Sequence, residues 1–288
     1  MKHTMRQCNA KPHGSQQQPS DRPVTGSASW LTTALLATVL AVGAFAQEAR
    51  AQENGDETSF DEADLFLELN DTDGDLGIQA FIDGDAYRTL VIRPPNGSRL
   101  LFVRATGRLG RQGLNELGFE SDEPPLDEFP QERFFRRFPE GEYLIRGRTL
   151  EGDLLENTAE LTHVLPAPPA GITVSGTPID PDSVDCDEGP LPLVTESEII
   201  ISWDPVTLSH PEVGRTGELE VDSYQVVVEQ DVGEQELIFS VDLPPFQTEV
   251  QVPPEFIGLG AEEFDFEILV REASGNLTAI ESCFAVAG

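Results

Sequence analysis

Residues 199–205 read Ile-Ile-Ile-Ser-Trp-Asp-Pro. Ile199, Ile201 and Trp203 occupy alternate positions of this stretch. In an extended chain, alternate side chains lie on the same face of a sheet. β-Branched and aromatic residues also favour strands over helices. The stretch therefore predicts a β-strand that carries its tryptophan into a hydrophobic core.

The same strand composition recurs on both sides of this stretch. The segments that show it are residues 172–174, 221–228, 248–252, 264–268 and 277–284. Several short strands separated by turn residues are typical of an antiparallel β-sandwich. The second half of the chain is therefore expected to be an all-β domain.

This half resembles a fibronectin type III domain over about residues 166–288. The resemblance rests on a pair of prolines before the first strand, on Trp203 in the second strand, and on the strand spacing. Two features depart from the family. Phe264 stands where the family has a corner tyrosine, and residues 175–198 form a long acidic insertion. Membership of this family implies a binding or spacer module, without naming a ligand.

The first half of the chain, residues 63–165, also has strand composition. Turns are expected at residues 70–75, 83–85, 94–97 and 151–153, and one short helix at residues 131–138. Residues 139–143 read Pro-Glu-Gly-Glu-Tyr, which is similar to the run that opens the penultimate strand of immunoglobulin-like sandwiches. In those sandwiches the tyrosine hydroxyl, here that of Tyr143, donates a hydrogen bond to the preceding loop.

The two halves are therefore expected to be tandem immunoglobulin-like and fibronectin type III-like β-sandwiches. The proline-rich segment 165–170 predicts a stiff linker between them. Each half has its own set of strands, so residues 63–165 and 166–288 are expected to fold independently.

The beginning of the chain has the composition of a targeting segment. Basic residues precede an apolar run at residues 30–46, which ends in Ala-Phe-Ala. This order is typical of a secretory signal peptide over residues 1–46. A membrane anchor is the alternative, but the run is at the lower limit for a span and no basic cluster follows it. We therefore expect a secreted or periplasmic protein whose mature chain is not inserted in a membrane, with residues 47–62 as a disordered acidic lead-in.

The charge of the chain restricts its partners. The formal net charge is −34, with 52 acidic and 18 basic residues. So negative a protein is a poor ligand for nucleic acid or anionic lipid. Eleven arginines lie between Arg88 and Arg148, and only Arg215 and Arg271 follow residue 165. This asymmetry indicates an electrostatic contact between the domains, a face for an anionic glycan, or simply a mixed surface.

Two cysteines remain after removal of the signal peptide, Cys186 in the acidic insertion and Cys283 in the last strand. An even pair in an exported protein predicts a disulfide. It would close a long loop and contribute at most about 4–5 kcal/mol to the free energy of unfolding in the chain-entropy model.

Asp71, Asp73 and Asp75 alternate on one predicted turn and could present several oxygens to calcium. The turn is not an EF-hand, because Leu76 and Ile82 occupy the positions of the required glycine and bidentate acid. A different calcium loop and an ordinary acidic turn remain as alternatives. A second acidic group, at residues 180–188, is interpreted as a solvated loop held by its cysteine.

The motifs of common enzymes are missing from the sequence. It has no Gly-x-Ser-x-Gly, no P-loop and no dinucleotide fingerprint, and neither His163 nor His210 has metal-ligand spacing. We therefore expect an exported, non-catalytic binding or spacer protein with a protein or glycan partner, and no cofactor other than calcium. The alternatives are a calcium-stabilised adhesion or surface component and a small secreted hydrolase.

Overall fold

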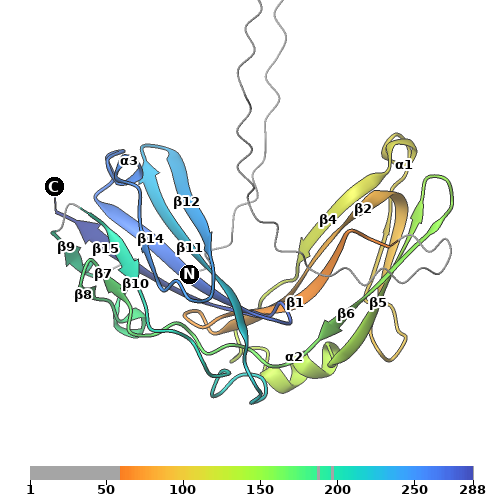
Figure 1. The fold of residues 1–288 in the computed structure, drawn as a ribbon, viewed down its shortest axis with the longest axis horizontal. Helices are drawn as coiled ribbons and strands as arrows, with labels where there is room; N and C mark the ends of the chain where they lie inside the picture. The colour runs from red at the N-terminus through yellow and green to blue at the C-terminus, as the bar shows by residue number, and fades with distance from the viewer. Residues whose placement is uncertain (1–58, 187–188, 196–197, 288) are drawn as a thin grey trace, which may run out of the picture. The chain divides into compact units, whose positions relative to one another are not determined.

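The structure is a computed structural model, and it describes residues 59–287 except 187–188 and 196–197. The expected signal peptide and most of the expected lead-in lie outside these residues. Among the described residues, no helix is both long enough and apolar enough to cross a membrane. The fold is built almost entirely of β-strands (Figure 1).

The N-terminal sandwich, residues 59–165, is formed around one long strand. Its elements are β1 (Glu62–Asn70), β2 (Asp75–Arg93), β3 (Leu101–Arg104), α1 (Leu109–Gln112), β4 (Leu114–Glu120), α2 (Gln131–Arg137), β5 (Gly141–Thr149) and β6 (Leu154–Leu161). Strand β2 pairs along different parts of its length with β1, β3, β4 and β5, and β6 pairs with β5. The side chains that alternate inward from these strands form one hydrophobic core.

The turn expected at residues 83–85 is wrong, because β2 continues through it. The pairing of β2 with β4 is irregular between Asp83 and Tyr87, which accommodates the extra residues without reversing the chain. Gly84 allows Phe60 to pack closely against the strand; it does not form a turn. A Cβ atom there would lie 3.2 Å from atoms of Phe60, which packs against the strand.

Other expectations for this half are confirmed. A turn separates β1 from β2, and the expected helix is α2. The hydroxyl of Tyr143 donates to the carbonyl of Pro139 at 3.0 Å, as expected for a tyrosine that braces a sandwich corner. The lead-in, however, ends before residue 62. Phe60 is 2% exposed in the core, where its ring meets the edge of Tyr87.

The C-terminal sandwich, residues 166–287, consists of two sheets around a second core. Its elements are β7 (Thr173–Val174), β8 (Thr177–Pro178), the 3-10 helix η1 (Pro181–Ser183), β9 (Leu193–Val194), β10 (Ile200–Ser202), β11 (Val221–Val232), β12 (Gln235–Leu243), β13 (Glu249–Gln251), α3 (Pro254–Ile257), β14 (Glu263–Glu272) and β15 (Leu277–Val286). One sheet has the order β13-β10-β7-β8, and the other contains β12-β11-β14-β15. Trp203 is buried between them against Tyr224, as the alternating pattern predicts.

The two sandwiches share a sheet. The end of β1 pairs in parallel with the start of β15 through Glu68–Leu277, Leu69–Thr278 and Asn70–Ala279. Strand β15 therefore lies between β14 and β1, and the hydrogen-bonded sheet continues from one sandwich into the other (Figure 1). Parallel pairing of strands so distant in sequence could not be predicted from local patterns.

A buried asparagine joins three segments at this junction. Asn276 is 0% exposed, and its side-chain oxygen accepts a hydrogen bond from the backbone N–H of Leu67 at 2.8 Å. Its amide nitrogen donates to the carbonyls of Thr162 and Val164 at 3.0 and 2.9 Å. One side chain thus satisfies buried backbone groups of β1 and of the segment that leaves β6.

The proline-rich segment is held in place by specific contacts. The hydroxyl of Thr278 donates to the carbonyl of Pro166 at 2.8 Å, and the backbone of His210 donates to Leu165 at 2.7 Å. Val213, from the C-terminal sandwich, lies in the N-terminal core. These contacts favour coupled unfolding of the two halves. Independent folding stays a prediction, and the division at residues 165–166 is a proposal.

Candidate functional site

The three aspartates expected to bind calcium do not share one role. Asp71 accepts a hydrogen bond at 2.8 Å from Nε2 of His210, whose side chain is buried. The other ring nitrogen, Nδ1, accepts the backbone N–H groups of Glu212 and Val213 at 3.1 and 2.8 Å. Because Nδ1 acts as an acceptor, the ring proton is on Nε2 and points at Asp71. This aspartate therefore fixes a loop of the C-terminal sandwich.

The turn itself is closed by its own side chains. The side-chain oxygen of Asn70 accepts the backbone N–H groups of Thr72 and Asp73 at 3.1 and 3.3 Å, which is an Asx turn. Asp73 is exposed, whereas Oδ1 of Asp75 is buried and has no hydrogen-bond partner among the described residues. Burial, and then the charges of Asp73 and Glu281, raise the pKa of Asp75 to about 6. Calcium binding here stays a prediction.

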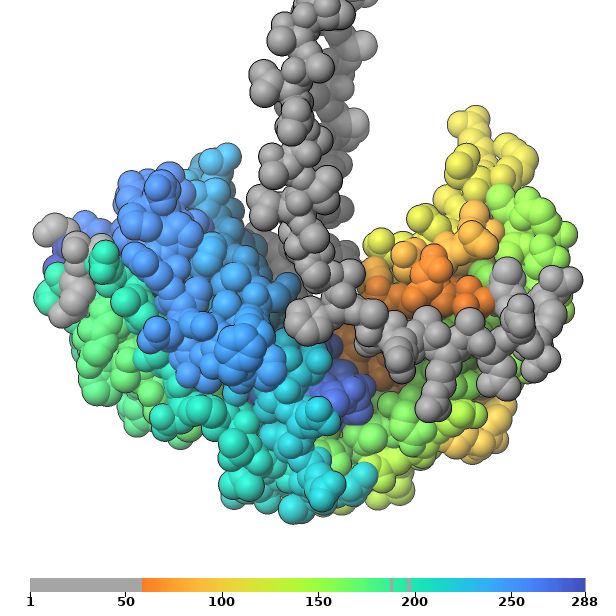
Figure 2. All heavy atoms as spheres, in the orientation of Figure 1, coloured from red at the N-terminus to blue at the C-terminus, as the bar shows by residue number. Residues whose placement is uncertain are grey.

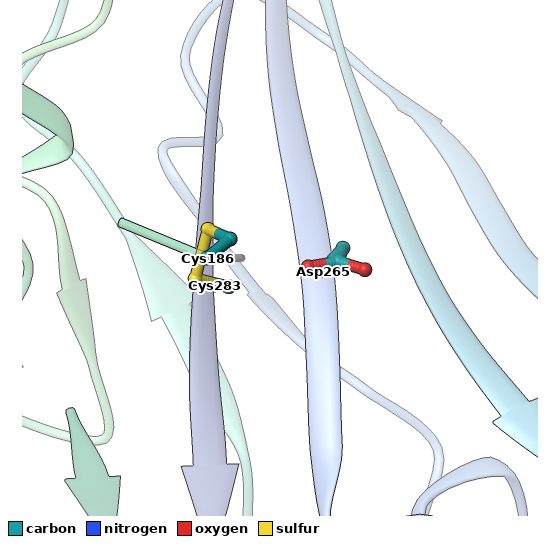
Figure 3. Close-up of side chains that lie close together, drawn as sticks. All are labelled: Cys186, Asp265 and Cys283. Carbon is teal, nitrogen blue, oxygen red and sulfur yellow. A yellow bond between two sulfur atoms is a disulfide. The ribbon is translucent and has the colours of Figure 1, made fainter. Parts of the chain in front are cut away.

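The predicted pair of cysteines forms a disulfide, with 2.05 Å between the two sulfur atoms (Figure 3). It ties the acidic insertion to β15, beside Asp265 of β14. Cys186, Asp265 and Cys283 are the one group of three potential metal ligands within 4.8 Å of one another in the described part of the chain. Both sulfurs are bonded to each other, so this group offers a metal one carboxylate and no thiolate.

Part of the acidic group at residues 180–188 lies near Asp71 of the predicted calcium turn. Asp180 and Asp182 line a cleft of about 360 Å³ together with Asp71, Pro168 and Pro169. The three carboxylates are not gathered within 4.8 Å of one another, so the cleft does not assemble a cation cage in this structure.

A row of carboxylates, absent from the sequence predictions, crosses the shared sheet. Its members lie on β11, β14, β15, β1 and β4 and just after β4: Glu229, Glu267, Glu281, Glu68, Glu120 and Glu123. We call this set the carboxylate row. Glu267 and Glu281 are directly opposite each other in register. The period-two alternation of a strand predicts which face of the sheet each residue occupies. Only the pairing of β15 with β1 brings the glutamates of the C-terminal strands next to those of the N-terminal strands.

Burial and the repulsion of neighbouring carboxylates raise the pKa values of four members of the carboxylate row: Glu68, Glu123, Glu229 and Glu267. Burial first, and then Glu281 and Glu68, raise the pKa of Glu267 to about 8. Burial, and then Glu120, raise the pKa of Glu68 to about 7. Burial and the charge of Glu68 raise the pKa of Glu123 to about 8. Glu123 packs directly over Gly77, where a Cβ atom would collide with its carboxylate.

Five of the eleven arginines between Arg88 and Arg148 lie together on a cationic face of the N-terminal sandwich. Leu90, Ile92 and Ile145 point into the core, so the residues that alternate with them on β2, β3 and β5 point outward. Those outward residues are Thr89, Val91, Arg93, Phe102, Arg104, Arg146 and Arg148. We call them, together with Arg99 two residues before β3, the arginine face.

The strand register sets the layout of the arginine face. Thr89 pairs with Arg104 on one side and with Arg148 on the other, which places these arginines about 10 Å apart across the strands. In the next row, Val91 lies between Phe102 and Arg146. The first row therefore has a guanidinium group on each side of Thr89, and the second has the ring of Phe102 on one side of Val91 and a guanidinium group on the other.

The arginine face is open and largely without internal counterions. Phe102 is 47% exposed, and the guanidinium of Arg99 lies 5.2 Å from its ring centroid. Arg146 is paired with Glu156 on β6. In the described part of the chain, four arginines of the face have no carboxylate within 4.0 Å: Arg93, Arg99, Arg104 and Arg148. Two of them donate to backbone carbonyls instead, Arg93 to Gly97 at 3.1 Å and Arg148 to Gly152 at 3.0 Å.

Comparisons with known proteins yield similarity of fold only. No protein-family model and no curated protein matches the chain. Among solved structures, the FN1–FN3 domains of chicken CNTN1 match with 12% identity and a TM-score of 0.28, covering 80% of this chain and 69% of that one. Two fibronectin type III domains of chicken tenascin match with 13% identity and a TM-score of 0.25, covering 81% and 99%.

A structure described for a 1.5-MDa bacterial ice-binding adhesin matches with 12% identity and a TM-score of 0.22, and the coverage is 80% of this chain and 66% of that one. Scores and identities this low support no conclusion about function. The strand content, the two cores and the sheet pairings identify the chain as an all-β protein built of antiparallel β-sandwiches.

Proposed function

We propose that this is an exported, non-catalytic binding protein, which recognises a protein or glycan partner and holds it at a defined place on a two-sandwich scaffold. The observation that carries this proposal is the arginine face. It combines an exposed aromatic ring with four arginines, Arg93, Arg99, Arg104 and Arg148, for which the described residues provide no carboxylate partner. Exposed aromatic and arginine side chains are the types that contribute most to binding at protein surfaces.

The polar contacts of the sandwiches support a non-catalytic role. The side chains of both described histidines, His163 and His210, make structural contacts within the fold. His210 holds Asp71, and His163 contacts the carbonyl of Phe138 at 2.8 Å and stacks on Phe135. Glu68 and Glu267 of the carboxylate row are partly buried, and burial together with neighbouring carboxylates accounts for their raised pKa values without a catalytic role.

A pull-down from the native envelope or medium tests the proposal. The bait is the protein from residue 47 onward, immobilised through its C-terminus, and the comparison bait carries Phe102→Ala. We expect at least one protein or polysaccharide that the wild type retains and that the variant loses. Turnover of a glycoside, ester or peptide substrate by the wild type would overturn the non-catalytic assignment.

A further inference from the structure

We infer that the arginine face binds an anionic polysaccharide, one whose sugars carry carboxylate or sulfate groups. This inference rests on the proposed function and names the chemical class of the partner. It is carried by three features of the face: guanidinium groups that have no carboxylate partner among the described residues, an exposed aromatic ring, and the regular spacing that the strand register gives them. Of these groups, that of Arg148 donates one hydrogen bond to the carbonyl of Gly152 at 3.0 Å, which leaves its other donors for a ligand.

The first feature selects an anionic partner. A guanidinium group offers a planar fork of donors that matches a carboxylate or sulfate. The protein has many carboxylates, yet none of those described pairs with Arg104 or Arg148. An anionic ligand would therefore supply the counterions that the described residues do not provide. Displacing small ions by a polyanion is favourable because the ions are released to the solution.

The second feature selects a saccharide over a simple polyanion. Phe102 presents 47% of its surface to solvent on β3, between Arg99 and Arg104 in the sequence, with Val91 and then Arg146 beside it across the strands. A ligand that has charged groups but no apolar surface would leave the ring of Phe102 exposed to water. A sugar ring has an apolar face of C–H groups as well as its charged substituents, so it can cover Phe102 while its acid groups reach the arginines.

The third feature is the open, repeating geometry. Arg104 and Arg148 are about 10 Å apart across β2, and Arg146 and Arg148 are two residues apart along β5. Such a layout suits a chain with repeated acid groups better than a single small anion. The rest of this acidic protein does not prevent contact, because at physiological salt charges are screened over about 8 Å.

A second copy of this chain is the competing occupant, since its C-terminal sandwich is strongly acidic. Self-association brings two bodies of the same large negative charge together, which opposes it. A polysaccharide lies along the face alone and avoids most of that repulsion. We therefore assign the face to a polysaccharide and treat self-association as an outcome of the test.

Biolayer interferometry with the protein from residue 47 onward tests the inference. The probes are polygalacturonate and dextran sulfate, with neutral dextran and polyglutamate as comparisons. We expect at least one acidic polysaccharide to bind and neutral dextran not to bind. The double variant Arg104→Gln/Arg148→Gln should weaken binding by about tenfold or more, and Phe102→Ala should weaken it several-fold.

The matched control is Arg111→Gln/Arg136→Gln, which removes the same charge from exposed arginines of α1 and α2. The segment that holds α1, yellow in Figure 2, is open to solvent on the visible side of the molecule. We expect this control to weaken binding by less than about threefold. Unchanged melting temperatures would show that all the variants fold. Arg104→Lys/Arg148→Lys keeps the positive charges but removes the planar pair of guanidinium donors. Its affinity should lie between those of the wild type and the glutamine double variant.

Four outcomes would overturn the inference. These are no binding of either acidic polysaccharide, equal loss in the control, equal binding of polyglutamate, or self-association by sedimentation that the face variant abolishes. Failure here is separable from failure of the proposed function. If the polysaccharides do not bind but Phe102→Ala still loses a protein in the pull-down, the protein remains a binding module with a different partner.

Discussion

Replacing Glu267 by glutamine should stabilise the protein at pH 8 and have almost no effect at pH 5. Glu267 lies on β14, opposite Glu281 on β15, and its pKa is raised by burial and by neighbouring carboxylates from 4.5 to about 8. A raised pKa means that the folded state binds the proton more tightly than the unfolded state does. The resulting stability is complete below pH 4.5 and is lost as the pH rises through about 8.

The magnitude follows from the same two values. At about 1.4 kcal/mol for each pH unit, the difference between 4.5 and about 8 corresponds to a cost of about 5 kcal/mol once the folded carboxylate is ionised. Salt and small shifts of the surrounding side chains reduce this cost, and we expect a net effect of about 2 kcal/mol at pH 8. For a body of this size, that is a rise of about 4–8 °C in melting temperature.

Thermal unfolding followed by circular dichroism at pH 5 and pH 8 measures the effect. Asp242→Asn is the control, because it removes a charge of the same sign from the exposed surface of β12. We expect Glu267→Gln to raise the melting temperature at pH 8 only, and the control to change it little at either pH. Equal stabilisation at both pH values would show that the carboxylate repulsion is not the cause. Destabilisation at pH 8 would show that Glu267 makes a favourable ionised contact.

The remaining predictions concern the junction, the disulfide and calcium. Asn276→Ala removes the side-chain partner of two buried backbone groups and one partly buried group, and it should lower the free energy of unfolding by about 3 kcal/mol or more, whereas Asn96→Ala in an exposed turn should change it little. A fragment beginning at Pro168 is expected to melt cooperatively but at a lower temperature than the same sandwich in the longer protein, because it loses β1 from the edge of β15. No cooperative melt would refute the proposed boundary. Thiol labelling of the unfolded, unreduced protein should find no free sulfhydryl, and reduction should lower the stability by up to about 4–5 kcal/mol. Calcium and sodium at equal ionic strength should raise the melting temperature equally in the wild type and in Asp73→Ala, because Asp71 is occupied by His210. A calcium-specific rise that the variant lacks would establish the site.

Local pattern was sufficient for the elements of this protein and for much of its second core. Alternation around Trp203 predicted a buried strand, and the Pro-Glu-Gly-Glu-Tyr run predicted the hydrogen bond of Tyr143. These features depend on neighbours within a few positions, whose side chains follow the period of the strand. Where the same reasoning failed, at residues 83–85, glycine and aspartate favoured a turn that the packing of Phe60 against Gly84 overrode.

The surfaces were decided only by tertiary structure. Composition showed that the arginines are concentrated in the first half, but the pairing of β2 with both β3 and β5 places Arg104 and Arg148 on either side of Thr89. The carboxylate row likewise depends on β15 lying beside β1, which joins residues more than two hundred positions apart. Long-range strand pairing is set by the summed packing of two cores, not by the sequence of either strand. That is why the residues of both surfaces were visible in the sequence while the surfaces themselves were not.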